Sequence, residues 1–89
     1  MVARVIISGF VHGVGFRQHI GRKARGLDIA GWVRNLSDGR VAALFSGSKE
    51  KIEEAVGECW KGPFLSEVKS VDVEWVENNR QYKDFEIRT

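Results

Sequence analysis

The chain has 89 residues, 43% of them hydrophobic and 29% charged, with one cysteine and a formal net charge of +2 at pH 7. This length and composition exclude a two-domain cofactor-binding enzyme and a disordered tail, and one cysteine excludes an internal disulfide. Because the sequence has neither an apolar run of 18 residues nor a secretory signal, we expect one folded, cytoplasmic domain, residues 1–89, with no membrane contact.

A strand and a helix are predicted first along the chain. Residues 4–10 contain the β-branched run Val5-Ile6-Ile7, which is typical of a buried central strand. From Phe16 onward apolar residues recur at spacings of four, four and three, which predicts one buried helical face. Gly26 is the predicted end of this helix.

A hairpin and a second helix follow. Residues 29–36 and 40–45 are strand-like runs on either side of Ser37-Asp38-Gly39, and Asp-Gly favours a hairpin turn. Ser48 is the predicted cap of a helix that ends at Gly62-Pro63. The predicted buried stripe of this helix consists of Ile52, Ala55, Val56, Cys59 and Trp60.

Two strands complete the predicted fold. Val71, Val73 and Trp75 alternate with polar residues, which predicts a half-buried strand, and Phe85 and Ile87 alternate in a last short strand. Asn78-Asn79 is the predicted turn between them. The order β-α-β-β-α-β plus a short final strand predicts a ferredoxin-like α+β sandwich, an antiparallel sheet with both helices on one face. This fold hosts many functions and does not by itself define one.

The strongest functional signal is the glycine-rich segment between the first strand and the first helix, residues 9–17, Gly-Phe-Val-His-Gly-Val-Gly-Phe-Arg. Glycines let successive backbone N–H groups converge, and the free N–H groups of the following helix favour an anion. Arg17, at the helix start, offers a guanidinium that matches two phosphate oxygens. The segment therefore predicts a small-anion site. A tight turn with a solvated Arg17 is the alternative, and neither a Walker A nor a G-x-G-x-x-G spacing is present.

The charge distribution favours an anion site in the same half of the chain. Residues 1–40 hold seven Lys or Arg against two Asp, a balance of +5, whereas residues 41–89 have a balance of −3. A chance asymmetry on a solvated surface is the alternative. A second segment of interest is residues 31–41, where the Asn35 carboxamide could hold a water in a fixed orientation or could be a plain turn residue.

These two segments resemble the signatures of the acylphosphatase family, a glycine loop ending in Arg17 and "GWVRN" followed by a turn that ends in Asp-Gly. Gly62-Pro63 and the closing Phe-Glu-Ile also fit, so the resemblance spans nearly the whole chain. It implies an enzyme that hydrolyses the carboxyl-phosphate bond of small acyl phosphates to a carboxylate and inorganic phosphate, without metal or other cofactor. By this resemblance, Asn35 positions the attacking water, and the phosphoryl group is held by Arg17 and by the backbone of His12, Gly13, Val14, Gly15 and Phe16.

The chain departs from the family pattern at two positions and invites a prediction at its end. His12 stands where the family commonly has glutamine, which should matter little if the loop binds through its backbone. Leu36 stands where some members have threonine, so any hydroxyl contact there is missing. In some relatives the terminal carboxylate pairs with the active arginine, so we expect deletion of Arg88 and Thr89 to weaken the site.

Other functions fit the sequence less well. RNA-recognition domains share this element order, but they stack bases on aromatic residues of the two central strands. Here the run Val5-Ile6-Ile7 of the first strand is aliphatic, and residues 41–45 of the third have Phe45 alone. We therefore expect no nucleic-acid partner. A regulatory or carbamoyl-phosphate-handling module of a larger protein is a third hypothesis, although we expect the chain to be complete, unattached and monomeric.

Several other conspicuous side chains have simple structural interpretations. We expect a partly exposed His19 on the flank of the first helix and Cys59 in the core. We expect the three tryptophans, Trp32, Trp60 and Trp75, in the core and its rim. We expect Arg22, Lys23 and Arg25 on a solvated face, with steering of acidic substrates as the alternative. His12, His19 and Cys59 lack the spacing of a metal site.

Overall fold

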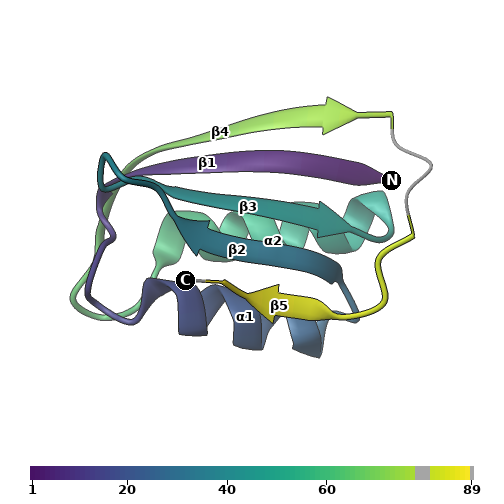
Figure 1. The fold of residues 1–89 in the computed structure, drawn as a ribbon, viewed down its shortest axis with the longest axis horizontal. Coiled ribbons are helices and arrows are strands. Elements are labelled where there is room, and N and C mark those ends of the chain that lie inside the picture. The colour runs from purple at the N-terminus through teal and green to yellow at the C-terminus, as the bar shows by residue number, and fades with distance from the viewer. Residues whose placement is uncertain (78–80, 89) are drawn as a thin grey trace.

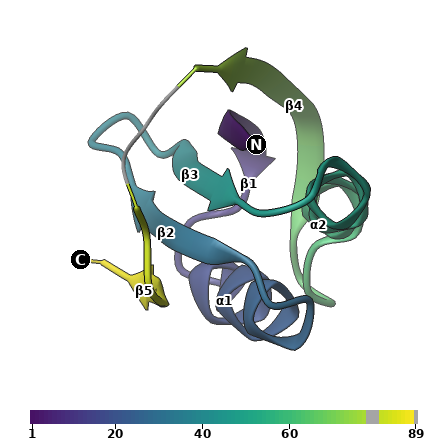
Figure 2. The ribbon, with the colours of Figure 1, turned by 90° about the vertical axis from the view of Figure 1, so that its right-hand side faces the viewer.

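Five strands form a sheet in the order β4-β1-β3-β2-β5, and two helices cover one of its faces (Figures 1 and 2). This computed structural model describes residues 1–77 and 81–88. Along the chain the elements are β1 (Val2–Phe10), α1 (Phe16–Gly26), β2 (Ala30–Asn35), β3 (Val41–Ser46), α2 (Lys49–Lys61), β4 (Glu67–Val76) and β5 (Phe85–Ile87). The predicted ferredoxin-like sandwich and its element order are confirmed. The predicted turn at residues 78 and 79 lies outside the described residues.

The central strands β1 and β3 carry the apolar layer against which the helices pack. β1 pairs antiparallel with both β3 and β4, and its Val5 and Ile7 have no exposed surface, as the β-branched run predicted. Their neighbours in the core cluster include Ala3, Val11, Phe16, Ile20, Ala24, Ile29, Val33, Val41, Ala43, Phe45, Ile52, Ala55, Cys59 and Phe85.

The sheet is mixed and not wholly antiparallel, because β5 pairs in parallel with β2. β4 ends at the end of the sheet where β2 begins, and the chain enters the opposite edge from there, so β5 runs in the direction of β2 (Figure 1). Alternation of apolar and polar residues predicted the strand itself. This alternation does not indicate whether a strand runs parallel or antiparallel to its neighbour. The expectation of a wholly antiparallel sheet was wrong for this reason.

α1 follows its predicted stripe, whereas α2 buries three of the five residues predicted for its own. In α1 the buried apolar residues are Phe16, Ile20 and Ala24, and the helix ends at Gly26. In α2 the side-chain oxygen of Ser48 accepts a hydrogen bond from the backbone N–H of Lys51 at 3.3 Å, which confirms the predicted cap. The buried residues of α2 are Ile52, Ala55 and Cys59.

Trp60, Val73 and Trp75 are more exposed than predicted. Trp60 is 51% exposed because it lies on the flank of α2 away from α1, beyond the buried stripe. Val73 and Trp75 pair with the buried Val5 and Ala3, so they lie on the helix face of β4. They are nevertheless 37% and 40% exposed, because β4 is an edge strand with no further neighbour to cover it.

Candidate active site

The loop between β1 and α1 owes its shape to two glycines. Gly13 and Gly15 have φ angles of 74° and 77°, in the left-handed region that side chains with a Cβ rarely adopt. A Cβ at either position would meet nothing within 4 Å, so conformation and not space requires glycine there. Gly15 is also the N-cap of α1, and it has no side chain to bond the helix N–H groups.

The N-terminus of α1 consequently keeps free hydrogen-bond donors. The first helical bond runs from the N–H of His19 to the carbonyl of Gly15, at 3.0 Å, so the N–H groups of residues 16–18 have no helical acceptor. The first turn also has no acidic residue. Free N–H groups and the helix dipole together favour an anion at this point.

The loop and the N-terminus of α1 line a pocket of about 150 Å³. It is lined by Val11, His12, Gly13, Gly15, Phe16, Arg17, Gln18 and Asn35. The structure thus brings six of the seven predicted site residues together. Val14 is the exception: it is absent from the lining, and its side chain packs against the core.

Val11 and Gln18 line the pocket but were not among the predicted site residues. Gln18 is the third residue after the cap Gly15, so counting forward along the first helical turn would have found another free N–H there. Val11 is buried, and its position follows from the end of β1 at Phe10.

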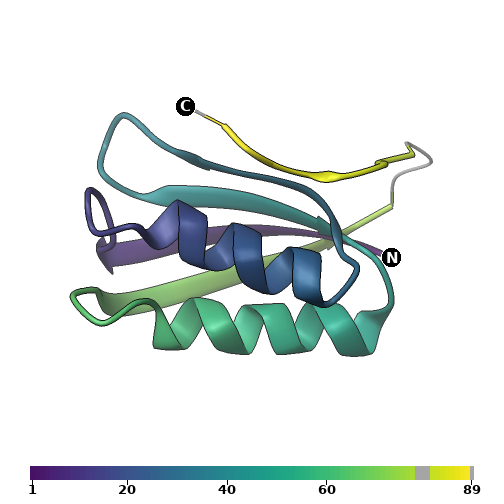
Figure 3. The same ribbon diagram turned by 90° about the horizontal axis from the view of Figure 1, so that it is seen from below.

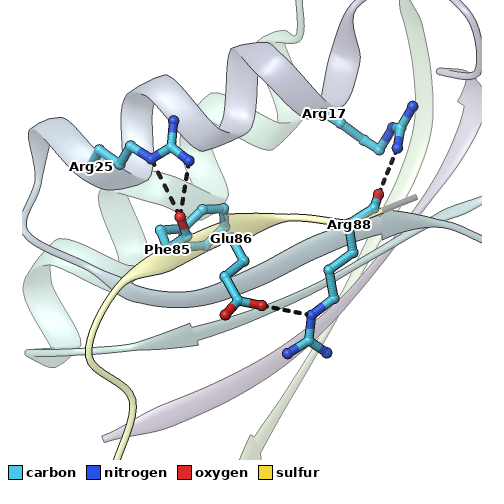
Figure 4. A network of polar contacts seen from close by, with 5 residues as sticks. All are labelled: Arg17, Arg25, Phe85, Glu86 and Arg88. Carbon is cyan, nitrogen blue, oxygen red and sulfur yellow. Dashed lines mark hydrogen bonds and ion pairs between the residues drawn. The ribbon is translucent and has the colours of Figure 1, made fainter.

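Arg17 is the only cationic side chain among the residues that line this pocket. It is half-buried, and its Nη1 donates a hydrogen bond to the carbonyl oxygen of Arg88 at 2.5 Å (Figure 4). The arginine fork has five N–H donors, so one bond to a carbonyl leaves most of them for an anion. Thr89, whose carboxylate was the predicted partner, lies outside the described residues.

Asn35 is placed by the hairpin that follows it. It is the last residue of β2, half-buried, and pairs with Val41 of β3. The turn is closed by a 2.7 Å hydrogen bond from the N–H of Leu36 to the carbonyl of Arg40. The Asp38 carboxylate accepts from the backbone N–H and the Nε of Arg40, which lowers the pKa of Asp38.

The other arginines of the first half are absent from the lining of the pocket. The guanidinium groups of Arg34 and Arg88 lie over the Trp32 ring, 5.3 and 5.1 Å from its centroid. Arg22, Lys23 and Arg25 are exposed, as predicted; Arg22 and Lys23 line a groove between α1 and α2, and Arg25 also donates to the Phe85 carbonyl. Of the basic residues that give the first half of the chain its excess charge, Arg17 alone lines the pocket.

His19 and Cys59 lie outside the pocket lining. Burial raises the pKa of the Cys59 thiol to about 12, and the thiol is in the core as predicted. The His19 side chain is partly exposed, as predicted, at 18%, and it lies against α2 with its Nε2 3.8 Å from a carboxylate oxygen of Glu58. Burial lowers the pKa of His19, partly offset by the Glu58 carboxylate.

The part of the chain that the structure describes offers neither a metal-ligand cluster nor a membrane-spanning helix. Residues 1–77 and 81–88 contain no group of three or more His, Cys, Asp or Glu that could hold a metal ion. No helix in the same part of the chain is long and apolar enough to span a membrane.

The fold and the loop define a ferredoxin-like α+β protein with a small anion-sized pocket at its first strand-helix junction. The acylphosphatase family model matches residues 3–87. Acylphosphatase of Pelotomaculum thermopropionicum is 41% identical over 85 residues, which cover 96% of this chain and 92% of that protein. The chain belongs to the acylphosphatase family, whose members are hydrolases that act on acid anhydrides, as the resemblance implied.

Two solved structures extend the comparison. The crystal structure of acylphosphatase from Bacillus subtilis has a TM-score of 0.96 and 32% identity, with all of both chains covered. A crystal structure of full-length HypF in a phosphate- and nucleotide-bound form has a TM-score of 0.88 and 35% identity. It matches all of this chain but 12% of its own length, so this fold also occurs as a small part of a much larger protein.

Proposed function

We propose that the protein hydrolyses the carboxyl-phosphate bond of small acyl phosphates and releases a carboxylate and inorganic phosphate. The observation that carries this proposal is the convergence of Arg17, the uncapped N-terminus of α1 and Asn35 on one pocket. At about 150 Å³ the pocket is smaller than the roughly 300 Å³ at which pockets for drug-sized ligands begin. It therefore suits a phosphoryl group, and the acyl part would remain outside, which favours loose acyl specificity.

The proposed roles follow from the chemistry of the lining groups. The Arg17 fork and the backbone N–H groups of residues 12–16 bind the phosphoryl oxygens and stabilise charge that develops there. The Asn35 carboxamide holds a water for in-line attack on phosphorus, since it can accept from the water and also donate. The bond from phosphorus to the carboxyl oxygen breaks, and the proton lost by the water passes to phosphate or solvent.

Such a sparse site is sufficient because the leaving group is a carboxylate. A carboxylate is stable as an anion at neutral pH, so it leaves without a general acid, and neither a metal ion nor a covalent nucleophile is required. Positioning and charge stabilisation carry the reaction. We propose that the enzyme acts as a monomer, since a domain of this size can bury a core of its own.

The test is phosphate release from benzoyl phosphate in EDTA by the wild type, Arg17→Ala and Asn35→Ala, with a phosphate monoester as the substrate control. We expect Arg17→Ala to lose both phosphate binding and turnover. Asn35→Ala should keep phosphate binding and lose about 10²-fold in kcat, the scale for one positioning group. Arg22→Ala is the matched cation control, because Arg22 is on the same helix but lines the α1–α2 groove.

Each outcome assigns a different function. Turnover of the acyl phosphate alone, lost in both site variants and kept in Arg22→Ala, would support the enzyme and both roles. A fully active Asn35→Ala protein would contradict the water role. No turnover in the wild type, with phosphate still bound through Arg17, would leave a phosphate-binding module, such as a part of a larger protein.

A further inference from the structure

Helix α1 meets β5 through three residues spaced four apart, Arg17, Gly21 and Arg25. Residues at this spacing lie on neighbouring turns of one helix face. Each of the three contacts a different residue of the chain end, and Figure 4 shows the two arginine contacts at the two ends of this row.

The order of these contacts along α1 is the reverse of their order along the chain end. Nε and Nη2 of Arg25 both donate to the carbonyl oxygen of Phe85, at 3.3 and 3.0 Å. Gly21 is buried beneath Ile87, and a Cβ at Gly21 would lie 2.7 Å from Ile87 Cδ1. Arg17 then donates to the carbonyl of Arg88. The chain end is therefore held at one end by Arg25 and is in contact with the active-site arginine at the other.

β5 is also anchored at its start, where Phe85 is buried in the core and stacks on Phe45 with ring centroids 5.9 Å apart, and the N–H of Gly31 donates to the carbonyl of Asp84 at 3.0 Å. It is three residues long and pairs in parallel with one neighbour, β2, and the N–H of Arg88 adds one bond to the carbonyl of Val33 at 2.8 Å. A parallel edge strand of this length is among the weakest elements of a sheet. Beyond Phe85, the contacts of Ile87 with Gly21 and of the Arg88 carbonyl with Arg17 tie the chain end to α1.

We propose that Arg25 and Gly21 are positioning residues for Arg17, a role that rests on the proposed function of that arginine. Arg25 clamps the Phe85 carbonyl, and the missing side chain of Gly21 lets Ile87 approach the helix. Together they hold the Arg88 carbonyl where it fixes one N–H of the Arg17 guanidinium. A long side chain with many rotamers is thereby held ready, with the rest of its fork free for the phosphoryl group.

The test compares Arg25→Met, which keeps the apolar stem but removes the donors, with Arg22→Met as the control on the same helix. We expect Arg25→Met to weaken phosphate inhibition and raise KM for benzoyl phosphate about tenfold, or 1.4 kcal/mol, with a smaller effect on kcat. Arg25→Lys, which keeps the charge and a donor, should restore part of the affinity. Arg22→Met should bind phosphate as the wild type does.

A second readout reports on Arg17 directly. In ¹⁵N NMR spectra of the arginine side chains, slow rotation of the Arg17 guanidinium should be lost in Arg25→Met and kept in Arg22→Met. In an Arg17→Lys background, Arg25→Met should have little further effect on phosphate affinity, because it acts through Arg17. An equal effect in both backgrounds would show a merely structural role.

The failure of this inference is distinct from the failure of the proposed function. A wild type that binds phosphate but does not hydrolyse benzoyl phosphate would contradict the proposed function and leave the phosphate and NMR measurements usable. Wild-type phosphate affinity and an unchanged Arg17 signal in Arg25→Met would overturn the positioning role. If Arg25→Met does not fold, Arg25→Gln and Gly21→Val decide by the same two measurements.

Discussion

At the scale of single residues, the pocket shows which parts of the site are local in sequence. Gly13, Gly15 and Arg17 lie within five positions, so the loop could be predicted from their spacing and from the helix that follows. The carbonyl that fixes Arg17 belongs to Arg88, 71 positions away. It is a backbone atom with no side-chain signature, so no reading of the sequence pattern could have found it.

Gly31 is a position where the adjacent strand leaves no room for any side chain. Its φ is +133°, and a Cβ would lie 1.8 Å from the carbonyl oxygen of Leu44 on the adjacent strand. We expect Gly31→Ala to lower the free energy of unfolding by at least about 3 kcal/mol, since backbone strain and a clash with backbone combine.

The matched control is Gly57→Ala, where an added Cβ meets nothing within 4 Å. Gly57 is inside α2, so alanine should raise the free energy of unfolding by about 0.5–1 kcal/mol. Urea denaturation of both variants measures the two effects. Equal stabilities of the two variants would contradict the packing described for Gly31.

At the scale of elements, periodicity predicted the helices and strands, but it did not predict which helix flanks and strands lie at the edge of the fold. The stripe of α1 was predicted residue by residue, because Phe16, Ile20 and Ala24 face a continuous sheet. Trp60 and Trp75 look equally apolar in sequence but lie on a helix flank and an edge strand. Which strand ends the sheet, and in which direction, depends on the connections between elements and not on alternation.

Helix α2 gives a prediction at this scale through its cap. Ser48→Ala removes the acceptor for the Lys51 N–H and should cost about 1 kcal/mol, which for a domain of this size is a fall in Tm of about 4–8 °C. Ser48→Asp keeps an acceptor and should retain the wild-type Tm within about 2 °C. Thermal unfolding followed by circular dichroism decides, and a wild-type Tm in Ser48→Ala would show that the cap contributes nothing.

At the scale of the whole molecule, the candidate site is assembled from three separate segments. The loop before α1, the hairpin after β2 and the end of β5 lie at the same end of the sandwich (Figure 3). The fold brings them together because β1 leads to α1 at the end where β2 finishes. The family resemblance implied that the first two segments form one site and that the chain end contacts its arginine, and the parallel entry of β5 explains how the chain end comes to lie there.

Stability of the whole fold should depend on pH through His19, which lies between the two helices. Burial lowers its pKa, opposed by Glu58 and reinforced by Lys23 and Arg22, so the unfolded chain binds a proton more readily than the folded one. The stabilising contribution of neutral His19 is complete above the ordinary value of 6.5 and is lost as pH falls through the lowered pKa. Urea denaturation across pH 4–8 should therefore show a smaller acid loss for His19→Gln than for the wild type.

His12 provides the comparison for this measurement, because it is exposed in the loop and outside the helix interface. His12→Gln should keep the acid loss of stability that the wild type shows. If His19→Gln and His12→Gln have the same pH profile as the wild type, the acid loss does not originate between the helices.

The reactivity of the buried Cys59 thiol reports on local opening of the fold. It is the only thiol in the sequence, it has no exposed surface, and it lies on the face of α2 that packs against the sheet. An alkylating reagent needs both access and a thiolate, and the closed fold supplies neither. The rate at which Cys59 is alkylated therefore measures how often α2 separates from the sheet, and no probe has to be engineered into the protein.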